Sequence, residues 1–141
     1  MEIRNIEESD LGPLVEIYLK AYESDWAPQE ALAYLMKFFR FEPGSCLMAV
    51  DGNRVLGAVF SFSYTKLGKN ILFLQEIFVD PDSRHQGAAR ALIGKLREAL
   101  GGPRVKVTPL VKADTNVLNF YNSLGFEQDE FVTFYDDQSY D

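Results

Sequence analysis

A short stretch at residues 84–92, RHQGAARAL, has the composition of a binding site for a charged group. It follows the apolar run ILFLQEIFV at 71–79, and its one glycine with the two alanines directly after it leaves the backbone open where a helix is predicted to begin. The first amides of a helix have no acceptor within the helix, and the helix dipole adds partial positive charge there. The stretch therefore predicts a site for phosphate or pyrophosphate, although an ordinary strand-to-helix turn is the alternative explanation of its glycine.

Neither of two common phosphate-binding fingerprints is present in this stretch. A P-loop needs G-x-x-x-x-G-K-[ST] and a dinucleotide fingerprint needs G-x-G-x-x-G, whereas the stretch contains only Gly87. Arg84 and His85 add charge or hydrogen-bond donors beside that glycine. His85 is the only histidine, and its place in the loop favours a role beside a phosphate over one in catalysis.

Glu76 lies in the middle of the apolar run 71–79. A carboxylate in a central strand is costly unless it has a partner or water, and burial raises the pKa of such a group and makes it a better general base. The alternative is a carboxylate that faces solvent. The single cysteine, Cys46, is expected to fill the core, because no neighbouring base that would activate it can be identified. No cluster of cysteines and histidines in the sequence indicates a metal site.

The hydrophobic pattern predicts the elements that position these residues. MEIRNI alternates as a strand, Ser9 or Asp10 can cap a first helix with Pro13 in its first turn, and Pro28 opens a second helix. The remaining predicted elements are strands at 46–50, 55–65, 71–79, 105–111 and 131–135, a helix from Gly87 to Leu100, and a short helix at 116–124 that Gly125 ends. The order is β-α-α-β-β-β-α-β-α-β, which predicts an α/β fold with a mixed, mostly antiparallel sheet, four flanking helices and one parallel, right-handed strand–helix–strand unit at 71–111.

Length and composition indicate one globular domain over residues 1–141. Apolar residues make up 47% and charged residues 25%, which is enough apolar material for a core. The single cysteine and the lack of a basic segment before an N-terminal apolar run predict a reducing, cytoplasmic location without a signal peptide. The net charge of −7 argues against a nucleic-acid binder, and no run approaches the ~20 apolar residues that span a membrane.

Residues 77–93, IFVDPDSRHQGAARALI, resemble the acyl-CoA signature of the GNAT superfamily of N-acetyltransferases. That signature is Arg/Gln-x-x-Gly-x-Gly/Ala after a strand, and this chain has Arg84-x-x-Gly87-x-Ala89 behind a V-x-P segment at 79–81. A second block, NVLNFYNSLGF at 116–126, is similar to the family's N-x-x-A-x-x-F-Y-x-x-x-G-F block with tighter spacing. The family residues that it keeps are Asn116, Phe120, Tyr121, Gly125 and Phe126, and Asn119 stands where alanine is common.

The resemblance implies acetyl-CoA as the acyl donor and a primary amine as the acceptor. It implies a sheet that opens between the strands 71–79 and 105–111, so that the pantetheine arm of the donor pairs with the backbone of Ile77, Phe78 and Val79. The residues that it implies around the pyrophosphate are Arg84, His85, Gln86, Gly87, Ala88, Ala89 and Arg90. In the second block it implies cofactor contacts from Asn116, Asn119 and Tyr121, although Asn116 could also cap its helix.

The same resemblance assigns the chemistry without a metal. Glu76 would remove a proton from the amine, directly or through water, and Tyr121 would return one to the CoA thiolate. The alternative for Tyr121 is an aromatic side chain packed on the sheet. Many relatives have a further strand after the last one predicted, so either a short strand or a neighbouring subunit in a homodimer completes the site. The alternative function is a non-catalytic acyl-CoA sensor with the same fold, but the retention of Glu76 and Tyr121 favours the enzyme.

The distribution of charge predicts a cationic acceptor, such as a polyamine, an amino sugar or a lysine side chain. Carboxylates occur around the first two helices and near the C-terminus, which in this family border the acceptor cleft; they are Glu23, Asp25, Glu30, Asp129, Glu130, Asp136, Asp137 and Asp141. Acidic walls concentrate a cation, although acidity that serves solubility is the competing explanation. Tyr22, Trp26 and Phe39 lie near the same helices and are either core residues or walls of the acceptor pocket.

Overall fold

The computed structural model describes residues 1–23, 25–109 and 115–136. The chain divides into two compact units, Met1–Thr108 and Pro109–Asp141, so the expectation of one domain stays a prediction. The first unit contains β1 (Glu2–Asn5), α1 (Leu11–Ala21), α2 (Pro28–Phe41), β2 (Cys46–Asp51), β3 (Arg54–Lys66), β4 (Lys69–Val79), α3 (Ala88–Ala99) and β5 (Arg104–Val107). The described part of the second unit contains α4 (Thr115–Ser123). Within the described ranges no helix has the length and apolar composition needed to cross a membrane.

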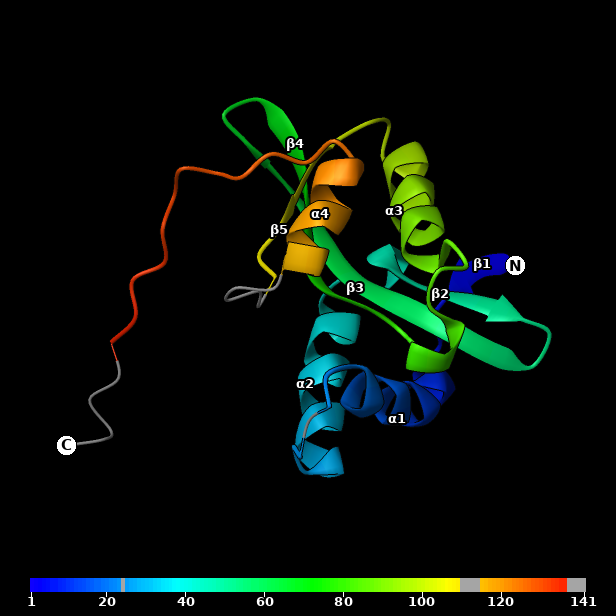
Figure 1. The fold of residues 1–141 in the computed structure, drawn as a ribbon. Helices are drawn as coiled ribbons and strands as arrows, with labels where there is room; N and C mark the ends of the chain where they lie inside the picture. The colour runs from blue at the N-terminus through cyan, green and yellow to red at the C-terminus, as the bar shows by residue number, and fades with distance from the viewer. Residues whose placement is uncertain (24, 110–114, 137–141) are drawn as a thin grey trace. The chain divides into compact units, whose positions relative to one another are not determined.

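The strands of the first unit form one sheet in the order β1-β2-β3-β4-β5 (Figure 1). Neighbouring strands are antiparallel except for β4 and β5, which are parallel, as the sequence predicts for two strands joined through a helix. The turn between β3 and β4 has positive φ at both Leu67 (53°) and Gly68 (73°), as a two-residue type I′ hairpin turn requires. The mixed sheet and its flanking helices confirm the predicted fold class.

Helices cover both faces of the sheet in the first unit (Figure 1). α1 and α2 bury their apolar stripes on one face, in a core that includes Leu14, Leu35, Phe60 and Phe78. α3 packs against β2, β3 and β4 on the other face, and its buried residues are Ala88, Leu92, Ile93 and Leu96. The face under α1 and α2 is called the α1/α2 face below, because it carries the candidate site.

Asp10 stands directly before α1, at one of the two predicted capping positions, but its side chain does not cap the helix. Both of its carboxylate oxygens accept from the guanidinium of Arg4, at 2.9 and 3.0 Å, and one also accepts from the backbone N–H of Glu7 at 2.8 Å. The hydrogen bond from Arg4 lowers the pKa of Asp10. This carboxylate therefore fastens β1 to the start of α1 instead of satisfying the first helical amides.

Two predicted strands near the C-terminus differ from the structure. The strand predicted at 131–135 is wrong: residues 131–136 form no strand, and the side chain of Phe134 is 93% exposed. A run of β-branched and aromatic residues does not make a strand by itself, because the backbone groups of a strand must pair with a second strand. The strand predicted at 105–111 ends at Val107, shortly before Pro109, which has no N–H to donate; residues 110 and 111 lie outside the described residues.

Candidate functional site

One extra residue in β4 shapes the region around Glu76. The register between β3 and β4 shifts between Phe60 and Ser61, because Phe60 faces Glu76 while Ser61 faces Leu74. Gln75 is the unopposed residue of this β-bulge. Successive side chains of a regular strand point to opposite faces, but the side chains of Gln75 and Glu76 both reach Tyr34 on the α1/α2 face. The bulge therefore places an amide and a carboxylate side by side.

Three tyrosine hydroxyls hold the carboxylate of Glu76; they are named the tyrosine clamp and belong to Tyr18, Tyr22 and Tyr34. Oε1 of Glu76 accepts from Tyr34 at 2.7 Å and from Tyr18 at 3.2 Å, and Oε2 accepts from Tyr22 at 3.1 Å. Gln75 Nε2 donates to the hydroxyl of Tyr34 at 2.9 Å. A carboxylate offers about four acceptor positions, so the clamp fills three of them and fixes the orientation of Glu76.

The clamp residues come from the apolar stripes of α1 and α2. Tyr18 is buried among the core residues of the α1/α2 face, and Tyr34 is half-buried beside them. Burial raises the pKa of Tyr34 to about 12, and burial together with the charge of Glu76 raises the pKa of Tyr18 still further. Both hydroxyls therefore keep their protons at neutral pH and act as donors to Glu76.

Aromatic rings surround the clamp and reach the surface. The ring of Trp26 lies 5.5 Å from that of Tyr34 and 6.2 Å from that of Tyr18, and Trp26 is 39% exposed. Tyr22, which follows the last residue of α1, is 45% exposed although its hydroxyl reaches Glu76. Phe39 packs partly buried against the core. Of the three aromatic residues whose role the sequence left open, Tyr22 therefore contacts Glu76, Trp26 packs against the clamp residues Tyr18 and Tyr34, and Phe39 packs against the core.

β4 has a second strand partner along only part of its length. Its residues Ile71–Leu74 pair with Arg104–Val107 of β5, and within the described residues no pairing with β5 continues beyond Leu74. On the other edge, β3 continues to pair with Ile77, Phe78 and Val79. Where a strand has a neighbouring strand on one side only, the N–H and C=O groups of every second residue make no hydrogen bond to a strand. One of them, the carbonyl of Ile77 at 3.3 Å, shares the single proton of the Tyr22 hydroxyl with Oε2 of Glu76.

The loop after β4 is held in place by cations from two other elements. Lys20 Nζ of α1 contacts Asp80 Oδ1 at 3.3 Å and Asp82 Oδ2 at 2.6 Å. Arg54 Nη2 of β3 donates to the carbonyl of Asp82 at 3.2 Å. Arg84 then donates to the carbonyl of Ala21 at 3.3 Å, at the C-terminal end of α1, where the helix dipole favours a cation. These contacts hold the backbone of residues 80–84, which lead into α3.

The N-terminus of α3 has the open backbone that the sequence predicts. Gly87 is its N-cap residue with φ of 81°, and no side chain caps the helix. His85 also has a positive φ, 66°, and its side chain is exposed, as are those of Arg84, Gln86 and Arg90. The first helical hydrogen bond runs from Ala91 N–H to Gly87 O at 2.9 Å, so the preceding helical amides have no acceptor in the helix. This terminus suits an anion such as a phosphate.

The second unit contains the other predicted site residues on α4. Asn116 is the second residue of this helix, so it does not occupy the capping position that was its alternative role. Tyr121 is half-buried, and its ring lies 5.4 Å from that of Phe126. Gly125 ends the helix with φ of 86°, and the N–H groups of Gly125 and Phe126 bond back to the helix at 3.0 Å each. The predicted C-cap is confirmed, while the roles of Asn116, Asn119 and Tyr121 stay predictions.

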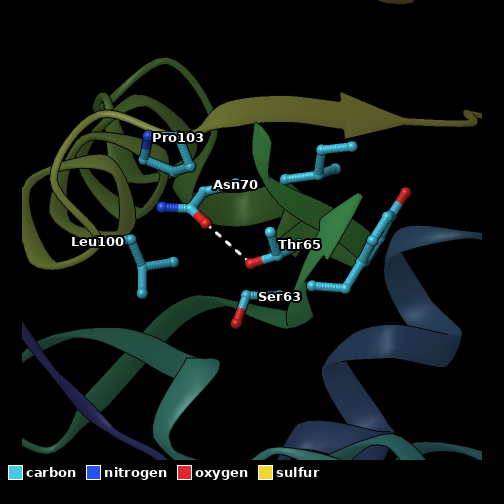
Figure 2. Close-up of a pocket in the computed structure, with 7 residues that line it drawn as sticks. Ser63, Thr65, Asn70, Leu100 and Pro103 are labelled. Atoms are coloured by element: carbon cyan, nitrogen blue, oxygen red, sulfur yellow. Dashed lines mark hydrogen bonds between the residues drawn. The ribbon is translucent and has the colours of Figure 1, made fainter. Parts of the chain in front are cut away.

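Two features of the first unit lie outside this site. Cys46 is fully buried, as predicted, and burial raises the pKa of its thiol to about 11, which disfavours a nucleophilic thiolate. A cavity of about 330 Å³ lies at the far end of the β3–β4 hairpin, between Ser63, Thr65 and Asn70 of the hairpin and Leu100 and Pro103 after α3 (Figure 2). Asn70 stands six residues from Glu76 along β4, roughly 20 Å at about 3.3 Å per residue. Within the described ranges no cluster of His, Cys, Asp or Glu could hold a metal.

The sequence did not single out Tyr18, Tyr34 and Gln75 as functional residues. Gln75 lies within the apolar run 71–79 and Tyr18 and Tyr34 lie in the two predicted N-terminal helices, where neither amide nor hydroxyl stands out locally. The signal that was available is the use of tyrosine at positions in apolar helical stripes where phenylalanine would pack as well. A buried hydroxyl needs a partner, and Glu76 is a natural one in the strand below.

The sequence of this chain was compared with protein families and with individual known proteins. The model of the Acetyltransferase (GNAT) family matches residues 11–126. An uncharacterized N-acetyltransferase of Methanocaldococcus jannaschii, MJ1207, is 32% identical over 143 aligned positions, which cover 92% of this chain and 62% of that protein. The chain thus spans less than two thirds of the length of this curated relative.

Two solved structures share the fold. The aminoglycoside antibiotic 6'-N-acetyltransferase AAC(6')-IG from Acinetobacter haemolyticus superposes with a TM-score of 0.77 at 17% identity, covering 98% of this chain and 99% of that one. The aminoglycoside N-acetyltransferase AAC(6')-Iy in complex with CoA superposes with a TM-score of 0.76 at 19% identity, covering 97% and 94% of the two chains. At these identities the likeness concerns the fold alone.

The open N-terminus of α3 gives the first testable prediction. The substitution Gly87→Asp is expected to weaken CoA binding severely, because it adds a carboxylate beside the helical amides and a side chain at a φ of 81°. A Cβ at this position meets no other atom within 4 Å, so the protein should still fold. Isothermal titration calorimetry with CoA measures the effect.

Gly101→Asp is the matched control, since Gly101 follows the other end of α3, has a φ of 71° and is equally unobstructed. It should bind CoA as the wild type does. Equal CoA affinity in folded Gly87→Asp protein would show that this helix terminus does not receive the cofactor.

Proposed function

The chain belongs to the acetyltransferase (GNAT) family, and from this membership and the geometry around Glu76 we propose that it transfers an acetyl group from acetyl-CoA to a primary amine. The transfer is a direct attack within a ternary complex. The observation that carries the proposal is the half-buried carboxylate of Glu76, held by three tyrosine hydroxyls on the part of β4 that β5 leaves unpaired. Glu42 is also half-buried and accepts three hydrogen bonds, but its donors are Ser45 and Ser63 and not tyrosines.

The backbone of the first unit suits the parts of acetyl-CoA, which supplies an activated acyl carbon when bound. The open amides at the start of α3 suit its pyrophosphate, and the exposed side chains of Arg84, His85, Gln86 and Arg90 stand around them. The unpaired edge of β4 at Ile77–Val79 suits the amides of the pantetheine arm, which pair with an exposed strand edge as an added strand does. The CoA complex of a protein with the same fold supports this choice of donor.

Glu76 is assigned as the general base. An amine attacks a thioester carbonyl only in its neutral form, so its ammonium form must first lose a proton. Oε1 of Glu76 accepts two hydroxyls and Oε2 accepts one, which leaves Oε2 as the oxygen with capacity for a further proton donor. Oε2 therefore takes the proton of the amine, directly or through one water.

Tyr121 is assigned as the general acid. As the new C–N bond forms, the C–S bond breaks and the sulfur leaves as a thiolate that needs a proton. The phenol of Tyr121 supplies it, and this role rests on the match of NVLNFYNSLGF to the family block. Asn116 and Asn119, which lie three residues apart on α4, are assigned to contacts with the cofactor on the same basis.

The acceptor is assigned as a cationic amine on the surroundings of Glu76. The segment that joins α1 and α2 exposes the rings of Tyr22 and Trp26, whose faces attract cations. The side chains of Glu23, Asp25 and Glu30 are exposed on or beside this segment. Aromatic faces and carboxylates together favour a ligand that carries a second positive charge besides the reacting amine, such as a polyamine or an amino sugar.

The base role predicts the effect of Glu76→Gln. Turnover at neutral pH should fall by roughly 10²–10⁴-fold, the usual contribution of a general base, because the amide cannot take a proton. CoA affinity should change little, since the substitution alters no backbone group of β4. Release of free CoA thiol from acetyl-CoA with a mixture of amines measures turnover, and calorimetry measures CoA binding.

Glu98→Gln, which changes an exposed carboxylate on α3, is the control and should keep full activity. Wild-type turnover in Glu76→Gln would contradict the assignment of the base. A wild-type protein that binds CoA but releases no thiol with any amine would instead indicate the acyl-CoA sensor.

The acid role predicts that Tyr121→Phe also lowers turnover, because the departing thiolate loses its proton donor. The pH–rate profiles of the wild type and the variant should therefore differ. Tyr64→Phe, at an exposed tyrosine on β3, is the control. Identical pH–rate profiles for wild type and Tyr121→Phe would remove Tyr121 from the mechanism.

The acceptor assignment predicts a dependence on salt and on two carboxylates. Polyamines and amino sugars should be better acceptors than neutral or anionic amines, and moderate salt should raise their KM because it screens the acidic surface. The double variant Glu23→Gln with Asp25→Asn should raise KM for these acceptors several-fold with kcat nearly unchanged. Activity confined to neutral or anionic amines, without an effect of salt, would contradict the assignment.

A further inference from the structure

The hydroxyl of Tyr22 lies between the two groups that the proposed reaction brings together. It is 3.1 Å from Oε2 of Glu76, the oxygen assigned to the proton of the amine, and 3.3 Å from the carbonyl oxygen of Ile77. A phenol has one proton, so these two acceptors share it. The other two tyrosines of the clamp, Tyr18 and Tyr34, instead donate to Oε1 of Glu76.

The carbonyl of Ile77 faces the unpaired edge of β4. The carbonyl oxygen of Phe78 is the first atom that a Cβ on Gly57 of β3 would meet, and the N–H of Asp80 donates to β3 at 2.7 Å. The backbone groups of Phe78 and Asp80 therefore face β3. Because successive residues of a strand turn their backbone groups to opposite edges, those of Ile77 and Val79 face the edge that suits the pantetheine arm.

The last turn of α1 fixes the position of this hydroxyl relative to β4. Lys20 pairs with two aspartates of the loop after β4, and the carbonyl of Ala21 accepts from Arg84 of the same loop. The N–H of Tyr22 bonds back to the helix at 3.1 Å, and its ring packs edge-on against that of Tyr18 at 4.9 Å. Successive residues thus fasten the end of α1 beside β4, with the Tyr22 hydroxyl between them.

Within the clamp, Tyr22 alone holds Oε2 of Glu76. Without its hydroxyl, Tyr18 and Tyr34 would still hold Oε1, but Oε2 could swing about that oxygen. The ring of Tyr22 is 45% exposed, so phenylalanine would pack there as well. The hydroxyl therefore serves the two acceptors and not the core.

We propose that Tyr22 is a positioning residue that couples the acyl donor to the general base. An amide N–H of the pantetheine arm bonds to the carbonyl of Ile77, and the hydroxyl of Tyr22 then donates to Oε2 of Glu76 alone. A hydrogen bond is stronger when its proton is not divided between two acceptors, so donor binding completes the clamp on the oxygen that faces the amine. Tyr22 acts through Glu76 and exchanges no proton with a substrate. The inference rests on the proposed function, because it takes the arm and the base as assigned there.

The coupling has a thermodynamic consequence for the two ligands. An amine that binds at Oε2 of Glu76 should bind more tightly to the CoA complex than to the free protein, by roughly 5-fold or more, the lower range of measured couplings between sites. The amine must raise the affinity for CoA by the same factor, because coupling between two binding sites is reciprocal. Both factors should fall to one in Tyr22→Phe, whose ring cannot join Ile77 to Glu76.

The kinetic test compares Tyr22→Phe with Tyr34→Phe. The probe amine is spermidine or glucosamine, whichever releases more CoA thiol with the wild type. The kcat of Tyr22→Phe should fall by roughly 10- to 100-fold, the size of one hydrogen bond to a charged group. Its KM for acetyl-CoA should stay near the wild-type value, since no backbone group of β4 changes. Tyr34→Phe is the matched variant, because it also loses a donor to Glu76 but leaves the contact with Ile77 intact.

The binding test uses calorimetry with CoA and the same amine, a pair that cannot react. CoA should raise the affinity for the amine in the wild type and in Tyr34→Phe, but not in Tyr22→Phe. Circular dichroism and thermal unfolding establish that each variant is folded. A wild-type kcat in Tyr22→Phe, a gain from CoA that survives in this variant, or no gain in the wild type would each overturn the inference. A wild type that releases no thiol with either amine would instead contradict the proposed function, and the inference would fall with it.

Discussion

The bulge at Gln75 is the constraint on which the rest of the site depends. One additional residue in β4 breaks the alternation of side chains, so that Gln75 and Glu76 both point to the α1/α2 face. A bulge also bends the strand that carries it. Within the part of the chain that the structure describes, the pairing between β4 and β5 reaches Leu74, directly before the bulge. One local irregularity thus accompanies both the presented carboxylate and the unpaired strand edge beside it.

The helices α1 and α2 serve the core and the site with the same stripes. Their leucines pack on the sheet, while the tyrosines among them carry hydroxyls to Glu76. A hydrogen bond to a charged group is worth roughly 1.5–3 kcal/mol, and removing an ion from water costs several kcal/mol. Three such bonds are therefore of the size needed to hold a half-buried carboxylate in one orientation. Without the clamp, Glu76 would gain by turning toward solvent.

Sequence reasoning recovered what is encoded locally. The periodicity of the helices, the parallel unit around α3 and the open backbone at Gly87 all depend on residues close together in the chain. Glu76 was recognised because a charge interrupts an apolar run. The clamp was missed because Tyr34 and Glu76 are 42 residues apart, and the bulge was missed because a register shift appears only when β3 and β4 are paired. The strand predicted at 131–135 was wrong because residue types that favour a strand do not supply a pairing partner.

A crystal structure of the protein with CoA and an amine acceptor would test the central claim most directly. The account predicts that the pantetheine amides bond to the backbone of Ile77–Val79, that the pyrophosphate contacts the first amides of α3, and that Oε2 of Glu76 faces the acceptor nitrogen while the tyrosine hydroxyls stay in place. CoA bound away from the unpaired edge of β4, or Glu76 turned away from an acceptor that lies beside the thioester, would contradict it.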